Sequence, residues 1–248
     1  MLKAILFDLG GTLLTYYTPE LSYWDINRIG IGALYRPLQR DGHKLPDENT
    51  FCQTLGDGLV VDWRTARAAK SSTGLVTFLR RSLQSWGVTV ADTDLQAVLQ
   101  MFYHRVAPYV GIFDDTVQVL DDLRAQGLKL GIISNTVWTR EMHDADLDRF
   151  GILHHFQQRI YSSEMPHVKP HTDIFERALA AMDILPEEAA FVGDRIIDDV
   201  GGAQAAGMAG VLKKISEREE ISDTIQPDAK IRTLQELLPW VKDRQKSC

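Results

Sequence analysis

Three short apolar segments of this chain each end on a small polar or acidic residue, and this pattern constrains the fold more than any other feature. They are residues 4–7 (AILF), which precede Asp8, residues 128–134 (LKLGIIS), which end at Ser134, and residues 189–194 (AAFVGD), which end at Asp194. Apolar runs of this length, bounded by turn residues, are typical of strands buried on both faces. The pattern predicts a parallel sheet whose strands deliver polar side chains to their carboxyl ends.

Segments with helical periodicity separate these strands. Residues 115–126 place Val117, Leu120 and Leu123 at helical spacing, and Gly127 follows as a stop signal. Residues 173–182 carry a second apolar stripe, and residues 234–241 are consistent with a closing helix. Two further short strands are expected at residues 209–212 and 229–231. Alternating strands and helices predict an α/β fold with a Rossmann-like parallel-sheet core.

Residues 16–109 follow a different pattern, because they lack comparable apolar strands. Leu75, Phe78, Leu79, Leu83 and Trp86 form one helical stripe, and a second stripe runs from residue 95 to residue 106. Residues 41–49 are polar and are expected to form a loop. We therefore expect an inserted helical cap domain at residues 16–109, and a core made of residues 1–15 and 110–248.

Composition and charge narrow the possible partners. The 248 residues include 27 Lys and Arg against 34 Asp and Glu, a net charge of −7, so a nucleic-acid or anionic membrane surface is not expected. Apolar runs are too short for a membrane span or a secretory signal. The two cysteines, Cys52 and Cys248, are too far apart in sequence to suggest a disulfide framework. We expect a cytoplasmic monomer or homodimer.

Polar residues at the ends of parallel strands meet at one edge of the sheet, which is where ligands bind in such folds. Asp8, Ser134 and Asp194 are therefore expected to converge. Taken singly, each residue has an ordinary structural explanation as a helix cap or turn residue, and Lys169, which precedes Pro170, reads as a solvated lysine. Only the combination indicates a catalytic site.

Four motifs give this combination a resemblance to the haloacid dehalogenase superfamily of aspartate-nucleophile hydrolases. Residues 8–12 (DLGGT) are similar to its D-x-D-x-T motif, and residues 132–135 (IISN) to its strand that ends in Ser or Thr. Residues 168–170 (VKP) resemble its lysine motif, and residues 193–199 (GDRIIDD) its G-D-x-x-x-x-D motif. The order of the four motifs also matches, and the insertion resembles the small helical cap of the family.

The resemblance implies roles for residues around a transferred phosphoryl group. Asp8 would be the nucleophile, because a carboxylate divides a difficult displacement at phosphorus into two easier steps through an acyl-phosphate intermediate. The residues expected to hold or neutralise the phosphoryl group are Thr12, Ser134 and Lys169, and those expected to bind the substrate are Gly11, Asn135 and Arg195. Arg195 has a competing interpretation as an ion-pair partner of Asp198 or Asp199.

A magnesium ion is implied at the same place. Asp8, Asp194 and Asp199 would raise one another's pKa unless a cation lay among them, and oxygen ligands in small number suit Mg²⁺. The backbone carbonyl of Gly10 would be a further ligand. Asp198 competes with Asp199 for the last acidic position, and the family's spacing favours Asp199.

The main departure from the family pattern is Gly10, where its phosphatases have a second aspartate that protonates the leaving group. A positioned acid contributes about 10² to 10⁴ in rate. We expect Mg²⁺-dependent hydrolysis of a small phosphorylated metabolite with a good leaving group, or with a proton from water or the cap. Two alternatives stay open: a phosphate-ester-binding protein with little turnover, and a metal-independent 2-haloacid dehalogenase, which the clustered carboxylates disfavour.

The insertion is also rich in aromatic residues near its start. They are Tyr16, Tyr17, Tyr23, Trp24 and Trp63. Such residues either form a substrate pocket or pack between the helices of a cap, and packing is the commoner use.

Overall fold

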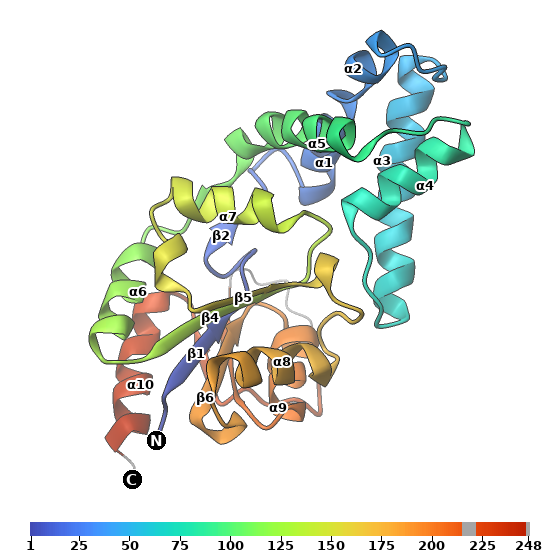
Figure 1. Cartoon of the computed structure of the whole chain (residues 1–248). Helices are drawn as coiled ribbons and strands as arrows, with labels where there is room; N and C mark the ends of the chain where they lie inside the picture. The colour runs from blue at the N-terminus through green and yellow to red at the C-terminus, as the bar shows by residue number, and fades with distance from the viewer. Residues whose placement is uncertain (215–221, 247–248) are drawn as a thin grey trace.

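A parallel sheet forms the centre of the computed structural model, which describes residues 1–214 and 222–246 (Figure 1). Within these residues six strands pair in the order β5-β4-β1-β6-β7-β8, and every pairing is parallel. The strands are β1 (Ala4–Phe7), β4 (Lys129–Ser134), β5 (Gln158–Tyr161), β6 (Ala189–Gly193), β7 (Ala209–Lys213) and β8 (Ala229–Ile231). The predicted Rossmann-like α/β architecture is confirmed.

The central strand β1 places the first motif between its two neighbours. Phe7 is in register with Ile132 of β4 on one side and with Val192 of β6 on the other. From β1 the chain order runs outward to β5 in one direction and to β8 in the other. The carboxyl end of β1 is therefore a topological switch point, where the crevice of an open α/β sheet lies.

Both faces of the sheet are covered, which explains why the central strands β1 and β6 are apolar throughout. Ile5 and Phe7 lie in one buried cluster, while Ala4 and Leu6 lie in the cluster on the other face. Two pairs of helices flank the sheet: α6 (Thr116–Ala125) and α10 (Leu237–Lys246), and α8 (Thr172–Met182) and α9 (Gly202–Ala205) (Figure 1). Each fully buried large aliphatic or aromatic side chain stabilises the fold by roughly 1.5–3 kcal/mol.

Five helices lie between β2 (Leu14–Thr15) and β3 (Gly111–Ile112), two short strands that pair antiparallel. The helices are α1 (Tyr23–Gly32), α2 (Tyr35–Arg40), α3 (Glu48–Ala68), α4 (Leu75–Ser85) and α5 (Asp92–Val106). Because β2 pairs with β3, the chain enters and leaves this helical segment at adjacent points. The helices α2, α3 and α4 gather on one side of the molecule, away from α8 and α9 (Figure 1). The exact division into a core and a cap stays a prediction.

The remaining elements are short, apart from α7 (Arg140–Arg149), which lies over the sheet (Figure 1). A π-helical turn spans Ile196–Gly201. The 3₁₀ turns span Ala107–Tyr109, Leu153–His155, Ser162–Glu164, Pro186–Glu188 and Leu234–Glu236. Among the residues that the structure describes, no helix combines the length and apolar character needed to cross a membrane.

Two local expectations from the sequence need correction. The expected polar loop at residues 41–49 ends early, because the Asp47 side chain accepts a hydrogen bond from the Thr50 backbone at 3.0 Å and so starts α3 at Glu48. The closing helix expected at residues 234–241 is a 3₁₀ turn followed by α10. The strand β5 was not expected from the sequence, because its first two residues are polar and only partly buried.

Candidate active site

Three carboxylates meet where the central strands end. One oxygen from each of Asp8, Asp194 and Asp199 lies within 4.8 Å of the others, and we call these residues the carboxylate cluster. Asp8 directly follows β1, Asp194 directly follows β6, and Asp199 lies in the π-helical turn beyond it. The Arg195 backbone N–H donates to Asp199 Oδ2 at 2.9 Å, and this bond turns the Asp199 side chain back toward the strand end. The parallel register thus brings together residues far apart in the sequence.

Lys169 joins this cluster from the loop before α8. Its Nζ lies 2.7 Å from Asp8 Oδ1 and 2.7 Å from Asp199 Oδ1, and it donates to the Ile133 carbonyl at 2.8 Å. The side chain is almost completely buried. The ordinary interpretation of Lys169 as a solvated lysine is therefore wrong, because all three contacts point it into the site.

Asn135 holds the Lys169 backbone. Its Nδ2 donates to the Lys169 carbonyl at 2.9 Å, and its Oδ1 accepts from the Lys169 N–H at 2.8 Å. Both polar groups of the amide are therefore engaged in positioning the lysine. Asn135 also lines the cavity above the cluster, and its expected contact with the substrate stays a prediction.

The cluster carries more negative charge than one lysine can balance. Burial raises the pKa of Asp8 to about 6, with Lys169 opposing and Asp199 reinforcing the rise. Burial and the charges of Asp8 and Asp199 raise the pKa of Asp194 to about 8. Burial alone would lower the pKa of Lys169, but Asp199 and Asp8 more than offset this and hold it above its usual value. A cation among the carboxylates would relieve this repulsion.

Asp198 and Asp199 point to different partners. Asp199 belongs to the carboxylate cluster, whereas the carboxylate of Asp198 pairs with the guanidinium of Arg67 on α3. Burial raises the pKa of Asp198 and Arg67 opposes the rise. The pairing links the helical segment to the core beside the cluster, and it agrees with the preference for Asp199 as the metal ligand, which itself stays a prediction.

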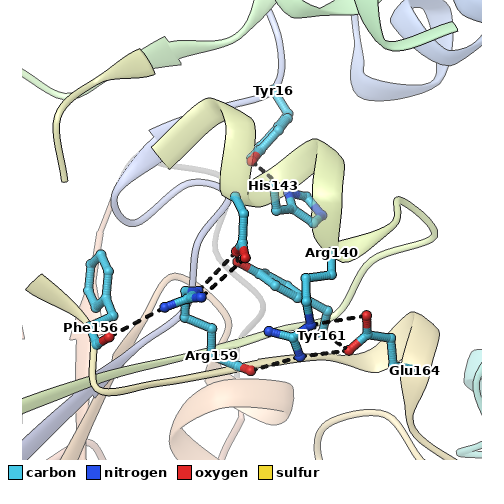
Figure 2. Close-up of polar contacts among 8 residues, drawn as sticks. Tyr16, Arg140, His143, Phe156, Arg159, Tyr161 and Glu164 are labelled. Atoms are coloured by element: carbon cyan, nitrogen blue, oxygen red, sulfur yellow. Dashed lines mark hydrogen bonds and ion pairs between the residues drawn. The ribbon is translucent and has the colours of Figure 1, made fainter. Parts of the chain in front are cut away.

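The loop after Asp8 has no room to spare at Gly10. A Cβ atom at this position would lie 3.2 Å from Cδ2 of Tyr16. The Tyr16 hydroxyl lies 2.9 Å from Nδ1 of His143, as Figure 2 shows, and Nε2 of His143 lies 2.8 Å from the Thr136 hydroxyl. Burial lowers the pKa of His143 to about 3, so its ring is neutral at physiological pH. An immobilised tyrosine thus lies beside Gly10.

The ring of His143 is itself held in place by a group of residues on β5 and α7. Its ring stacks on the ring of Tyr161 with centroids 4.9 Å apart (Figure 2). The Tyr161 hydroxyl donates to Asp144 Oδ1 at 2.8 Å, and Arg159 Nε donates to the same oxygen at 2.9 Å. Arg140 and Glu164 form an ion pair at 2.6 Å beside this group. Tyr16 is therefore fixed by a chain of contacts that runs through α7 to β5.

Gly11 and Thr12 occupy the tight turn of the same loop. Gly11 has a φ of +83°, which favours glycine, and its N–H donates to the Leu14 carbonyl at 2.8 Å. Thr12 is completely buried, and its hydroxyl has no hydrogen-bond partner among the described residues. Lys213 Nζ donates to the Thr12 carbonyl at 2.9 Å, and burial lowers the pKa of this lysine to about 8. The expected roles of Gly11 and Thr12 toward the substrate stay predictions.

A cavity of about 350 Å³ opens above the cluster. The candidate residues that line it are Asp8, Gly10, Gly11, Ser134, Asn135, Lys169, Asp194, Arg195 and Asp199, whereas Thr12 does not. The five aromatic residues near the start of the insertion also line it: Tyr16, Tyr17, Tyr23, Trp24 and Trp63. Arg67 and His143 were missed from the sequence. Both reach the cavity from helices, Arg67 from α3 and His143 from α7.

A family model for haloacid dehalogenase-like hydrolases matches residues 2–207. The chain belongs to the haloacid dehalogenase-like hydrolases. The matched residues include all four motifs and the inserted helices. The predicted family and the prediction of a hydrolase are therefore confirmed.

Curated relatives of this hydrolase are named as phosphatases. A glyceraldehyde 3-phosphate phosphatase of Methanopyrus kandleri is 33% identical over 159 residues, which cover 62% of this chain and 67% of the relative. A ribulose-1,5-bisphosphate 5-phosphatase of Halopiger xanaduensis is 27% identical over 248 residues, which cover 97% of this chain and 100% of the relative. Other phosphatase relatives are matched over only 58%, 63% and 62% of their length.

The solved structures that resemble this hydrolase include a 2-haloacid dehalogenase from Pseudomonas syringae pv. Tomato. Its TM-score is 0.70 and its sequence identity 25%, and the match covers 99% of this chain and 100% of the dehalogenase. Fold similarity of this extent extends over the sheet and the inserted helices. It does not by itself choose between reactions at phosphorus and at carbon.

Proposed function

We propose that this hydrolase cleaves a small phosphorylated molecule in a Mg²⁺-dependent reaction through an aspartyl-phosphate on Asp8. The contact of Asp8 with Lys169 at 2.7 Å, inside a cavity that Asp194 and Asp199 also line, carries the proposal. The phosphatase names of the relatives support it. Lys169 and a cation held by the carboxylate cluster would suit a phosphoryl group, because its oxygens need positive charge and a fixed orientation.

The donor set fits Mg²⁺. The ligands would be the carboxylates of Asp8, Asp194 and Asp199 and the backbone carbonyl of Gly10, which are all oxygen donors. Burial and the neighbouring carboxylates raise the pKa values of Asp8 and Asp194 even though Lys169 opposes the rise, so a further cation would favour their ionised forms. When bound, Mg²⁺ would supply the positive charge that keeps these groups ionised and neutralises the phosphoryl oxygens.

The residues of the chain divide the reaction into two displacements. The Asp8 carboxylate attacks phosphorus, and the bond from phosphorus to the leaving oxygen breaks as the new bond forms. Lys169 aims Asp8 and, with Ser134, would hold the phosphoryl oxygens. The leaving oxygen takes its proton from solvent, because Gly10 has no side chain. A water molecule then attacks the phosphorus, the bond to Asp8 breaks, and inorganic phosphate and free Asp8 result.

The helical segment would act as a cap over this site. The pairing of Arg67 with Asp198 and the donation of the Trp138 indole N–H to Asn27 Oδ1 at 3.0 Å both join it to the core. We propose that residues 16–109 exclude water during the first displacement and admit it for the second.

Displacement of halide from a 2-haloacid is the second candidate. The dehalogenase from Pseudomonas syringae favours it, because its identity of 25% extends over nearly the whole chain. This reaction needs an attacking carboxylate but no proton donor at Gly10. Asp194 and Asp199 weigh against it, because their charges would repel an anionic substrate unless a cation were bound.

Hydrolysis of acetyl phosphate tests the main proposal, because this small substrate has a leaving group that needs no proton. We expect turnover with Mg²⁺, loss of turnover with EDTA, and a fall on the order of 10⁴ in Asp8→Asn. Asp41→Asn, in an exposed loop, serves as the matched control and should be unchanged. Chloride release from 2-chloropropionate in EDTA would favour the second candidate. Phosphate binding without turnover of either substrate would instead indicate a binding protein.

A further inference from the structure

Aromatic side chains form a continuous wall on the side of the cavity that faces the helical segment. The rings of Tyr16 and Tyr23 meet edge to face at 6.4 Å, and those of Tyr23 and Trp24 do so at 5.0 Å. The rings of Trp24 and Trp63 lie tilted to one another at 6.5 Å. We call these four residues the aromatic wall. All four line the same cavity as Asp8, so the wall and the carboxylate cluster face a common space.

The wall begins next to the nucleophile loop. The Tyr16 ring touches the position of a Cβ at Gly10, two residues after Asp8. From there the wall continues through Tyr23 and Trp24 on α1 to Trp63 on α3. The leaving group of a substrate whose phosphorus lies at Asp8 would therefore lie against the aromatic wall.

Packing between helices does not account for the whole wall. Tyr23, Trp24 and Trp63 are only half-buried, although each is large and could be fully covered by its neighbours. Their uncovered surface borders the cavity. Ligand pockets are typically lined in this way, with apolar and aromatic surface around a few convergent polar groups.

The missing acid points to the same kind of ligand. A leaving alkoxide needs a proton, and a positioned donor is worth about 10² to 10⁴ in rate. A phenolic oxygen has a pKa of about 10, so it leaves as an anion far more readily than an aliphatic alkoxide does. A site that has Gly10 in place of the acid therefore suits leaving groups of low pKa, and among these the phenolates also have a ring that can stack on the aromatic wall.

We infer that the substrates are small phosphate monoesters of aromatic or heteroaromatic hydroxyl compounds, which stack on the aromatic wall. This inference rests on the proposed function of the same site. The bond between Asp8 and phosphorus forms while the bond to the aryl oxygen breaks. The aryloxide leaves with the electron pair and takes a proton from water. A cavity of about 350 Å³ holds such a molecule and the phosphoryl group together.

The test compares three substrates: acetyl phosphate, phenyl phosphate and ribose 5-phosphate. We expect kcat/KM for phenyl phosphate to exceed that for ribose 5-phosphate by at least about 10²-fold. Trp63→Leu and Trp24→Leu should each raise KM for phenyl phosphate about tenfold, in line with the usual effect of losing one stacking partner. Their activity on acetyl phosphate should change less than about twofold, because this substrate has no ring to stack.

The matched control is Trp86→Leu. Trp86 is a half-buried tryptophan that packs on Phe51 at 5.6 Å and does not line the cavity. This variant should leave all three substrates unchanged. Equal efficiency on the aryl and the sugar phosphate would overturn the inference. So would an equal loss of acetyl phosphate and phenyl phosphate hydrolysis in the two wall variants.

Binding of phenylphosphonate separates this inference from the proposed function. With Asp8→Asn protein we expect the phosphonate to quench tryptophan fluorescence, and methylphosphonate to bind at least about tenfold more weakly. If the wild type fails to hydrolyse acetyl phosphate, the proposed function fails, but preferential binding of the aryl phosphonate would still support the wall as a ring site. Equal binding of the two phosphonates would reject it.

Discussion

Replacing Gly10 with Asp places a carboxyl group two residues after Asp8 and tests whether the proposed reaction is limited by the lack of a proton donor. Gly10 does not have a positive φ, so its backbone accepts an L side chain. The new Cβ would lie 3.2 Å from Tyr16, a few tenths of an ångström closer than an ordinary contact. Because His143 holds the Tyr16 hydroxyl at 2.9 Å, the ring cannot simply turn away. Overpacking of this kind lowers the free energy of unfolding by about 1–3 kcal/mol.

The same change should raise activity selectively. For ribose 5-phosphate, whose leaving alkoxide needs a proton, we expect kcat/KM of Gly10→Asp to rise by about 10²-fold or more. For phenyl phosphate the gain should be small. Steady-state assays on both substrates measure the ratio, and urea unfolding measures the stability. Gly10→Ala adds the Cβ without the carboxyl group, and Gly10→Asn adds a side chain of the same shape without the acid.

The two controls make the expectation refutable. If Gly10→Asp changes both substrates by one common factor, leaving-group protonation is not what the site lacks. If Gly10→Asn gives the same gain as Gly10→Asp, the carboxyl proton is not the cause. If only Gly10→Asp is destabilised while Gly10→Ala is not, the cost arises from the buried charge and not from the contact with Tyr16.

Three further predictions concern the supports of the site. Asn135→Ala removes two hydrogen bonds to the Lys169 backbone, and urea unfolding should show a loss of about 1–3 kcal/mol together with a lower kcat on acetyl phosphate. Mg²⁺ at about 100 times its dissociation constant should stabilise the wild type by about 2.7 kcal/mol, and thermal unfolding should show a much smaller shift for Asp194→Asn. Burial raises the pKa of Asp146 to about 6, above its unfolded value of 3.8, so the native state binds the extra proton. The free energy of unfolding should therefore decrease as the pH rises from about 4 to about 6. The decrease should be on the order of 1–3 kcal/mol larger in the wild type than in Asp146→Asn, and parallel pH curves for the two proteins would contradict this assignment.

The sequence predicted the parts of the fold whose signal is local. The strands that end at Asp8, Ser134 and Asp194 have continuous apolar runs, because both faces of the sheet are covered. The helix α3 was not predicted from the sequence. Gly56 and Gly58 interrupt its apolar stripe and lower its intrinsic helix propensity. The edge strand β5 was missed because only half of its residues are buried.

The candidate site was predictable to the extent that its residues follow strands. Asp8 and Asp194 could be placed because each directly follows an apolar strand of a parallel sheet, and the resemblance to the family's lysine motif added Lys169. Arg67 and His143 could not be placed, because they reach the cavity from α3 and α7, whose position depends on tertiary packing. The engagement of Asn135 with the Lys169 backbone has no sequence signal either, since it joins two loops 34 residues apart.

The absence of a side chain at Gly10 and the position of the Tyr16 ring depend on each other. A side chain at residue 10 would press on the Tyr16 ring, and that ring is fixed by His143 through its hydroxyl and by the edge-to-face contact with Trp138 at 5.2 Å. The glycine two residues after Asp8 and the start of the aromatic wall therefore meet at the same contact. It follows that the stability cost of Gly10→Asp should depend on Tyr16. In Tyr16→Ala the overpacking cost should disappear, while the gain on ribose 5-phosphate should persist, because only the cost arises from the ring.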